Sequence, residues 1–467
     1  MDRELVELTP RRSPTRLIGF SGEGQGVIAR GAKLVQSLRA RPFRALTALV
    51  LLCVILATAG VNLWAWHQYR EANRLVEKQQ YPQAHAHFGQ CLRVWRWSAS
   101  THFLAARTAR RAGLYEEAEQ HLKESEKLEG NASGASLAIK LEHLLLMAQY
   151  GKISEVEEVL WSYVKKEKPE TPLILEAMAH GYKRMLRLGT AMRCLKMLLE
   201  REPDNVEGLV LRGWIQEAGA EPEEAIKDYR RALAVDPERD DAHLGLARIL
   251  VLQNDNLQEA RAHYEYVIAR HQENTDALVG LGEVYWALGE PEKARPIFDA
   301  LVAKDSSNSR ALAGLGDLTL AAGDATEGEA LLRRAVAADP GNAEAHYKLY
   351  LCLGPQSGRE AETAAQGETY RRVETDRKRL AELASKEMTR TPNDPKLHYE
   401  MGDIYLRNGK PEVGVRWLYS ALKLDPTHQP SHQALYDYYK RTGQVEKAEQ
   451  HRKEIRPSPP VQSPAQP

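Results

Sequence analysis

A spacing of 34 residues recurs along most of this 467-residue chain and limits the folds that it can form. The spacing is clearest in Thr275–Asn308, where two runs of apolar residues have the periodicity of helices. Gly289-Glu290-Pro291 stands between the runs, and this combination ends one helix and begins the next. The stretch predicts two short amphipathic helices joined by a tight turn. Because such a hairpin buries only one of its apolar sides, it requires neighbouring copies.

Copies follow in the same frame. One period downstream of the first stretch, Gly316 and Gly323 repeat the positions of Gly282 and Gly289. The prolines that close the copies are also one period apart, and each ends the helix before it. Two copies illustrate the frame best, with Leu278, Gly282, Tyr285, Ala294 and Phe298 in one and Gly402, Tyr405, Gly409, Ala421 and Pro426 in the other.

This order of small and aromatic residues ending in proline resembles the tetratricopeptide repeat (TPR). The resemblance implies an all-α fold, a TPR α-solenoid of about 11 helix-turn-helix repeats over residues 67–456. The ninth copy is interrupted, since its closing proline comes late at Pro392. We therefore predict a helical insertion at about 355–392, either a lengthened second helix or one additional helix, that projects from the solenoid.

Ala45–Trp66 contains no charged residue. At about 1.5 Å per residue the segment reaches about 33 Å, which is enough to cross a hydrocarbon core of about 30 Å. Trp64 and Trp66 stand where an interfacial aromatic belt would lie. The segment predicts one transmembrane helix that precedes the repeats without a linker. Ala57-Thr58-Ala59 resembles a signal-peptidase site, so cleavage is an open alternative to the uncleaved anchor that we predict.

The segments on either side of the predicted anchor suggest its orientation. Residues 1–44 are polar and basic, and we predict that they are mostly disordered and cytoplasmic. Five Lys or Arg lie in residues 25–44 against three in residues 67–86, which favours a cytoplasmic N-terminus. The repeats would then be extracytoplasmic (periplasmic). Residues 457–467 form a proline-rich tail that we also predict to be disordered.

Few features of the composition or the motifs indicate a catalytic, metal-binding or nucleic-acid-binding site. Lys plus Arg equals Asp plus Glu at 64 each, which argues against binding of nucleic acid. The four cysteines include no CxxC pair. His85 and His87 are two residues apart and point away from each other on a helix, while His67, His102 and His121 are isolated in the sequence. No phosphate-binding loop or GxSxG motif occurs, so we expect no enzymatic activity, no cofactor and no metal.

The TPR resemblance implies that the first helix of each repeat lines a concave groove and that its fifth, ninth and twelfth positions touch a ligand. In this chain the ninth positions change from basic to acidic along the array, with an aromatic residue near the middle. An accidental order of exposed charges is an open alternative. We predict that a protein or peptide partner contacts Arg107, Arg110, Arg111, His180, Lys183, Arg184, Trp214, Glu283, Trp286, Asp317, Asp403 and Asp437.

In this hypothesis the basic positions attract acidic residues of the partner, and Trp214 or Trp286 anchors it. The sequence thus favours a non-catalytic TPR scaffold in the membrane, anchored to the lipid bilayer through Ala45–Trp66 and similar to envelope TPR proteins that assist assembly or secretion. Two alternatives stay open, a cytosol-facing import or assembly receptor and the regulatory subunit of a separate enzyme. The sequence predicts neither the partner nor the oligomeric state.

Overall fold

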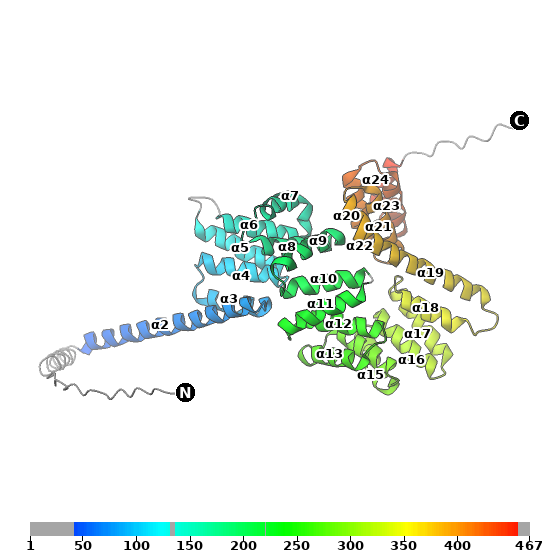
Figure 1. Cartoon of the computed structure of the whole chain (residues 1–467), viewed down its shortest axis with the longest axis horizontal. Coiled ribbons are helices and arrows are strands. Elements are labelled where there is room, and N and C mark those ends of the chain that lie inside the picture. Colours follow the sequence, from blue (N-terminus) through cyan, green and yellow to red (C-terminus); the bar gives the residue numbers. More distant parts are fainter. Residues whose placement is uncertain (1–41, 131–135, 220, 456–467) are drawn as a thin grey trace, which may run out of the picture.

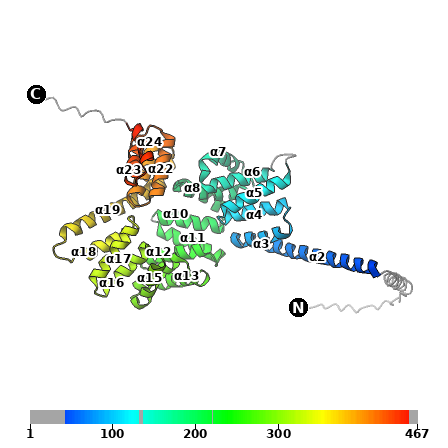
Figure 2. The same ribbon diagram turned by 180° about the vertical axis from the view of Figure 1, so that it is seen from behind.

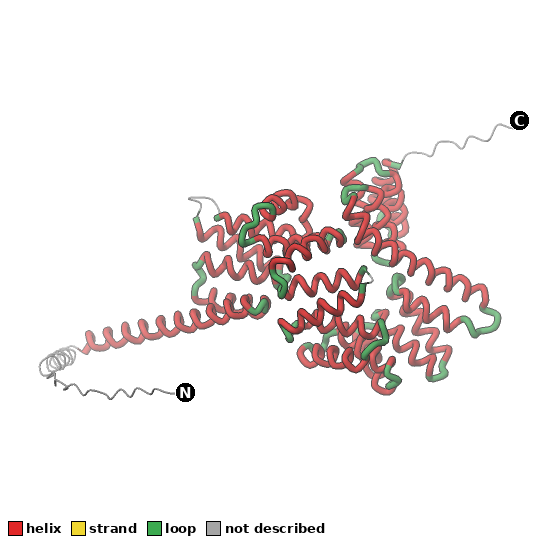
Figure 3. The backbone as a smooth tube through the Cα atoms, viewed as in Figure 1, coloured by secondary structure: helices red, strands yellow, loops and turns green. Residues whose placement is uncertain are grey.

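The computed structural model describes residues 42–130, 136–219 and 221–455. In this part of the chain all regular secondary structure is helical, and no strand is present (Figures 1 and 3). Residues 1–41 of the predicted basic segment and the whole predicted tail, 457–467, lie outside the described residues.

The helices follow one another as hairpin pairs, and each pair packs on the next. Within the described residues the pairs are α2 (Pro42–Glu77) with α3 (Tyr81–Val94), α4 (Ala99–Arg111) with α5 (Tyr115–Glu129), α6 (Leu137–Met147) with α7 (Ile153–Val164) through η1 (Ala148–Lys152), α8 (Thr171–Arg184) with α9 (Leu188–Arg201), α10 (Val206–Ala218) with α11 (Pro222–Val235), α12 (Asp240–Leu252) with α13 (Leu257–Arg270), α14 (Thr275–Ala287) with α15 (Pro291–Lys304), α16 (Ser309–Ala321) with α17 (Ala325–Ala338), α18 (Ala343–Leu353) with α19 (Glu360–Glu382), α21 (Pro395–Arg407) with α22 (Pro411–Leu424), and α23 (Gln429–Arg441) with α24 (Val445–Glu454). The predicted solenoid of about 11 repeats is confirmed.

Local signals in the sequence begin and end these helices. The side chain of Asn274 accepts a hydrogen bond from Ala277 N (2.9 Å) at the start of α14, and asparagines occupy the same place before α10, α16 and α18. In the turn between α14 and α15, Gly289 has a φ of 73°, which a residue without Cβ adopts at little cost. In the first repeat Gln79 adopts this left-handed conformation instead, with a φ of 59°.

Small residues allow the helices of neighbouring repeats to approach closely. Phe298 is fully buried between Gly282 and Gly314. A Cβ atom on Gly282 would lie 2.7 Å from the Phe298 ring, and one on Gly314 would lie 2.6 Å from it. The aromatic ring of one repeat therefore fills the space left by glycines of its own and the next repeat, as the spacing of small residues predicts.

The insertion in the ninth copy is a lengthened second helix, the first of the two predicted alternatives. Helix α19 is directly followed by η2 (Leu383–Glu387) and α20 (Met388–Arg390). The prediction that this insertion projects from the solenoid is wrong at its C-terminal end. Leu383, Ala384 and Met388 are buried, and η2 and α20 pack against α9, so α19 leads back toward an earlier repeat (Figures 1 and 2).

Helix α2 joins the apolar segment to the first repeat. It continues without a break from Pro42 to Glu77, as the absence of a linker predicts. Its stretch Leu46–Glu77 is the one helix of the described part that is long and apolar enough to cross a membrane, with a hydropathy of 2.4 in its best window and no buried residue there. Only after Trp64 do α2 residues become buried against α3, beginning with Ala65.

Candidate partner-binding cleft

Two adjoining cavities, of about 530 and about 200 Å³, lie along the first helices of the fourth to sixth repeats. They share His180 of α8, Glu207 of α10 and Asp241 of α12, so we treat them as one cleft. The larger cavity is also bordered by α4 and by the turn between α2 and α3, and the smaller one extends to Arg248.

The α2–α3 turn closes one side of the cleft although it is distant in sequence. The Gln79 side chain accepts a hydrogen bond from Val206 N (3.0 Å) and donates one to Asp204 O (3.5 Å), at the start of α10. The first repeat therefore contacts the fifth repeat directly. This contact, absent from any local pattern in the sequence, places the α2–α3 turn at the edge of the larger cavity.

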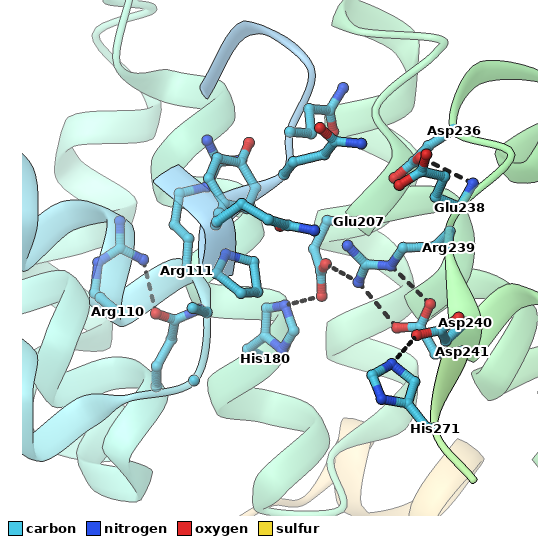
Figure 4. A pocket seen from close by; sticks show the side chains of 18 of the residues that line it. Arg110, Arg111, His180, Glu207, Asp236, Glu238, Arg239, Asp240, Asp241 and His271 are labelled. Carbon is cyan, nitrogen blue, oxygen red and sulfur yellow. Dashed lines mark hydrogen bonds and ion pairs between the residues drawn. The ribbon is translucent and has the colours of Figure 1, made fainter. Parts of the chain in front are cut away.

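A chain of ion pairs crosses the larger cavity (Figure 4). Glu207 accepts from His180 Nε2 (2.9 Å) on one side and pairs with Arg239 on the other. Arg239 also binds Asp241, with Nε 2.7 Å from the carboxylate. Burial alone raises the pKa of Glu207, but Arg239 and His180 outweigh burial and hold that pKa well below its usual range. Glu207 is therefore an anion that ties together α8, α10 and α12.

Two arginines of α4 border the cleft near the first repeat. Arg111 donates to Glu176 (Nε to Oε1, 2.8 Å) and lies 3.9 Å from the centre of the Tyr81 ring. Arg110 is 1% exposed and donates to Glu142 (2.5 Å) and Gln149 (2.7 Å). Its second terminal nitrogen, Nη2, has no hydrogen-bond partner among the described residues, so a buried donor beside the cleft is left unused.

The smaller cavity contains the aromatic residue expected near the middle of the array. Lys183 Nζ lies 4.2 Å from the centre of the Trp214 ring. Burial lowers the pKa of Lys183, which Glu207 and Asp241 partly offset. On the far side, Arg248 forms two hydrogen bonds with Glu217 (2.5 and 2.7 Å). Within the described residues Lys183 is a cation of the cleft without a direct ion pair.

The structure brings together five of the twelve residues predicted to contact a partner, all from the basic half of the array. They are Arg110, Arg111, His180, Lys183 and Trp214. The other seven lie elsewhere and have neighbours of their own: Arg107 with Glu142, Arg184 over Tyr115, Glu283 with Arg310, Trp286 with Asp317, Asp317 also with Lys348, Asp403 with Arg407 and Asp437 with Gln433.

These ion pairs weaken the hypothesis that the basic positions attract acidic residues of a partner, because most of these positions already have an internal partner. Arg107 and Arg110 share the single carboxylate of Glu142, and Arg111 pairs with Glu176. Reversing the charge of these three arginines would break buried ion pairs between repeats, and so would test stability before it tested partner binding. The sequence did not indicate the carboxylates that pair with these three arginines. It also did not indicate the run Arg239-Asp240-Asp241, in which Arg239 directly precedes α12 and the two aspartates begin it.

The histidines are less isolated than their spacing in the sequence indicates. His102 and His121 face each other across α4 and α5, with 3.1 Å between their Nδ1 atoms, and the ring of His85 lies 5.7 Å from that of His121. The prediction that His102 and His121 are isolated is therefore wrong, because helix pairing joins positions that are 19 residues apart. Burial first, and then His102 and His85, lower the pKa of His121 to about 4. The residues that the structure describes include no group of three or more possible ligands placed to hold a metal ion.

Stacked helix pairs with a cleft along their first helices define an α-solenoid, the class of repeat proteins that bind along an extended surface. The sequence comparisons name the kind of repeat. Three tetratricopeptide repeat models match the chain, one at residues 251–318, one at 69–134, 211–256 and 313–352, and one at 395–428. Together these matches span more than half of the sequence, and the chain belongs to the tetratricopeptide repeat family. Membership of this family supports a role as a protein-interaction scaffold.

Comparison with curated proteins gives no significant match. Among solved structures, the crystal structure of YrrB, described as a TPR protein with an unusual peptide-binding site, is 18% identical, covers 51% of this chain and 96% of its own, and has a TM-score of 0.28. A TPR protein from Parabacteroides merdae ATCC 43184 is 16% identical, with coverage of 62% and 98% and a TM-score of 0.33. Yeast Tom70 is 13% identical, with coverage of 85% and 93% and a TM-score of 0.33. These scores are low, so the family assignment rests on the matching models and on the helix pairs.

Proposed function

We propose that this chain is a non-catalytic scaffold that holds a segment of a partner protein in the cleft between the α2–α3 turn and Arg248. The observation that carries the proposal is the presence of unused binding groups in one cleft. Trp214 and Lys183 line the smaller cavity and offer an aromatic face and a cation without a direct ion pair. A partner segment with a carboxylate beside an apolar side chain would satisfy both groups.

The charge pattern supports recognition at short range. Most arginines of the cleft already have an internal partner, so the long-range field of the cleft is weak. We therefore expect the partner to be selected by contacts with Trp214 and by its hydrogen bonds, with modest dependence on salt.

The cleft is tested by photo-crosslinking in native membranes. A photoreactive phenylalanine analogue in place of Trp214 should give a discrete adduct that disappears when Lys183→Glu is added. The same analogue in place of Lys227, an exposed residue of α11, serves as the matched control and should give no such adduct. Equal adducts from both positions, or an adduct unaffected by Lys183→Glu, would contradict the proposal.

We also propose that the apolar part of α2 is a single-pass membrane anchor with a cytoplasmic N-terminus, and that the repeats assist assembly or secretion in the envelope. The length, the hydropathy and the exposure of this helix support the anchor. Protease added to sealed spheroplasts should digest the repeats and spare the N-terminal segment. Digestion only after the membrane is opened would instead place the repeats on the cytosolic side.

A further inference from the structure

The loop between α3 and α4 is attached to the apolar part of α2. Trp95 Nε1 donates a hydrogen bond to Asn62 Oδ1 (2.9 Å), and Cys91 Sγ donates to Ala65 O (3.4 Å). The ring of Trp95 also lies 6.0 Å from that of Tyr69. Helix α3 therefore runs back along α2 until its end is level with Asn62, beside the point at which α2 leaves the repeats (Figure 1).

This loop exposes aromatic residues next to arginines. Trp97 is 70% exposed, and Trp64 and Trp66 of α2 are about half exposed. The guanidinium group of Arg96 lies 5.0 Å from the centre of the Trp97 ring, and that of Arg70 lies 4.9 Å from Trp66. An indole ring has a large apolar body and one polar N–H, and a neighbouring guanidinium binds phosphate. This combination suits the boundary between hydrocarbon and lipid headgroups better than bulk water.

The position of the loop also locates that boundary along α2. If hydrocarbon covered the whole of Ala45–Trp66, the charged side chain of Arg96 would lie at the level of hydrocarbon, which is costly. A boundary near Asn62 avoids this cost. The uncharged stretch Ala45–Val61 is still about 25 Å long, within the range that spans a hydrocarbon core.

We propose that the Trp95–Trp97 loop lies in the headgroup layer of the bilayer and, with Trp64 and Trp66, seats the first repeat on the membrane surface. The inference rests on the membrane anchor proposed above. It assigns a second, peripheral membrane contact to the repeat domain itself, and it ends the membrane-spanning part of α2 a turn earlier than the sequence indicates.

Fluorescence quenching by brominated lipid tests this contact. The full chain is reconstituted into phosphatidylcholine vesicles whose acyl chains carry bromine close to the headgroup, and the quenched part of the tryptophan emission is measured. Trp97→Phe should remove roughly a quarter of the quenched emission, because four interfacial tryptophans would share it. Trp286→Phe, in α14, is the matched control and should leave the quenched emission unchanged.

The outcomes separate this inference from the anchor. If the chain floats with the vesicles but Trp97→Phe behaves like Trp286→Phe, the loop does not touch lipid, and the proposal is overturned while the anchor stands. In that case the loop faces water, a second copy or another protein. If the chain does not float with the vesicles, both the membrane anchor and the proposed contact of the Trp95–Trp97 loop with lipid are contradicted.

Discussion

Arg110 is among the largest fully buried side chains of the described residues, and its charge is balanced by one carboxylate. Both Arg110 and Glu142 have side chains that are almost inaccessible to water. Burial by itself raises the pKa of Glu142, yet Arg110 and Arg107 bring this pKa below its usual value. A buried pair contributes little relative to apolar packing, but loss of one partner leaves the other charge uncompensated.

Replacement of Glu142 tests this balance at the residue scale. Glu142→Gln keeps the shape of the side chain and removes its charge, so we expect the free energy of unfolding to fall by about 3 kcal/mol. The measurement is urea denaturation of the full chain in detergent. Glu273→Gln, which breaks the exposed pair with Lys304, is the control and should leave the transition unchanged. An equal effect of both substitutions would contradict the interpretation.

Elements far apart in the sequence also meet at α9. A Cβ atom on Gly189 would lie 2.2 Å from Thr389 Oγ1 and 2.5 Å from Ser385 O, so α9 and the η2–α20 segment touch where only glycine fits. Leu186, in the turn before α9, packs against the cluster that contains Leu383 and Met388. The lengthened helix of the ninth repeat thereby brings the last two repeats back to the fourth.

Gly189→Leu tests this contact at the scale of elements. The larger side chain should push η2 and α20 away from α9, because the nearest atoms include a backbone carbonyl that cannot rotate aside. We expect amide hydrogen exchange in α20 and η2 to accelerate at least tenfold, while exchange in α14–α17 is unchanged. Gly89→Leu, at a helical glycine of α3 with open space around it, should not alter exchange in α20. Unchanged exchange after Gly189→Leu would show that the contact is not formed.

The sequence predicts the features that depend on neighbours within one period. The proline and glycine positions of Thr275–Asn308 locate both helices of a repeat, and the glycines facing Phe298 indicate their close approach. The basic half of the candidate cleft is predictable for the same reason, since His180 and Trp214 stand at equivalent positions of first helices.

Contacts between distant repeats leave no such local signal. Gln79 reaches Val206, and Gly189 meets Thr389, only because of the path that the whole array takes. This path depends on small rotations at every junction between repeats, which add up along the chain. For the same reason the counter-ions Glu142 and Glu176 could not be assigned to their arginines from the sequence.

Buried and half-buried histidines are distributed along the array of repeats and make its stability depend on pH. Burial is the first cause that lowers the pKa values of His263, His346, His398, His428 and His451, and it lowers that of His121 to about 4. The unfolded chain, with histidine pKa values near 6.5, therefore binds more protons than the folded chain in this range.

We therefore expect the free energy of unfolding to fall as pH is lowered from about 6.5 toward 4. Thermal denaturation followed by circular dichroism at several pH values measures this dependence. His121→Gln removes a histidine whose pKa is lowered to about 4 and should make the decrease shallower. A denaturation temperature that is constant between pH 7 and pH 5 would contradict the prediction.

The unbroken course of α2 has a geometric consequence if its apolar part spans a bilayer as proposed. Helix α2 continues from Asn62 to Glu77, a rise of on the order of 20 Å, before the chain reaches the turn that borders the cleft. The helix is unbroken between these two points, so its length fixes the distance between the lipid surface and a segment bound in the cleft. A client that is itself embedded in the membrane would need about seven extended residues to cover this height. Shorter tethers would be excluded by distance alone, whatever their sequence.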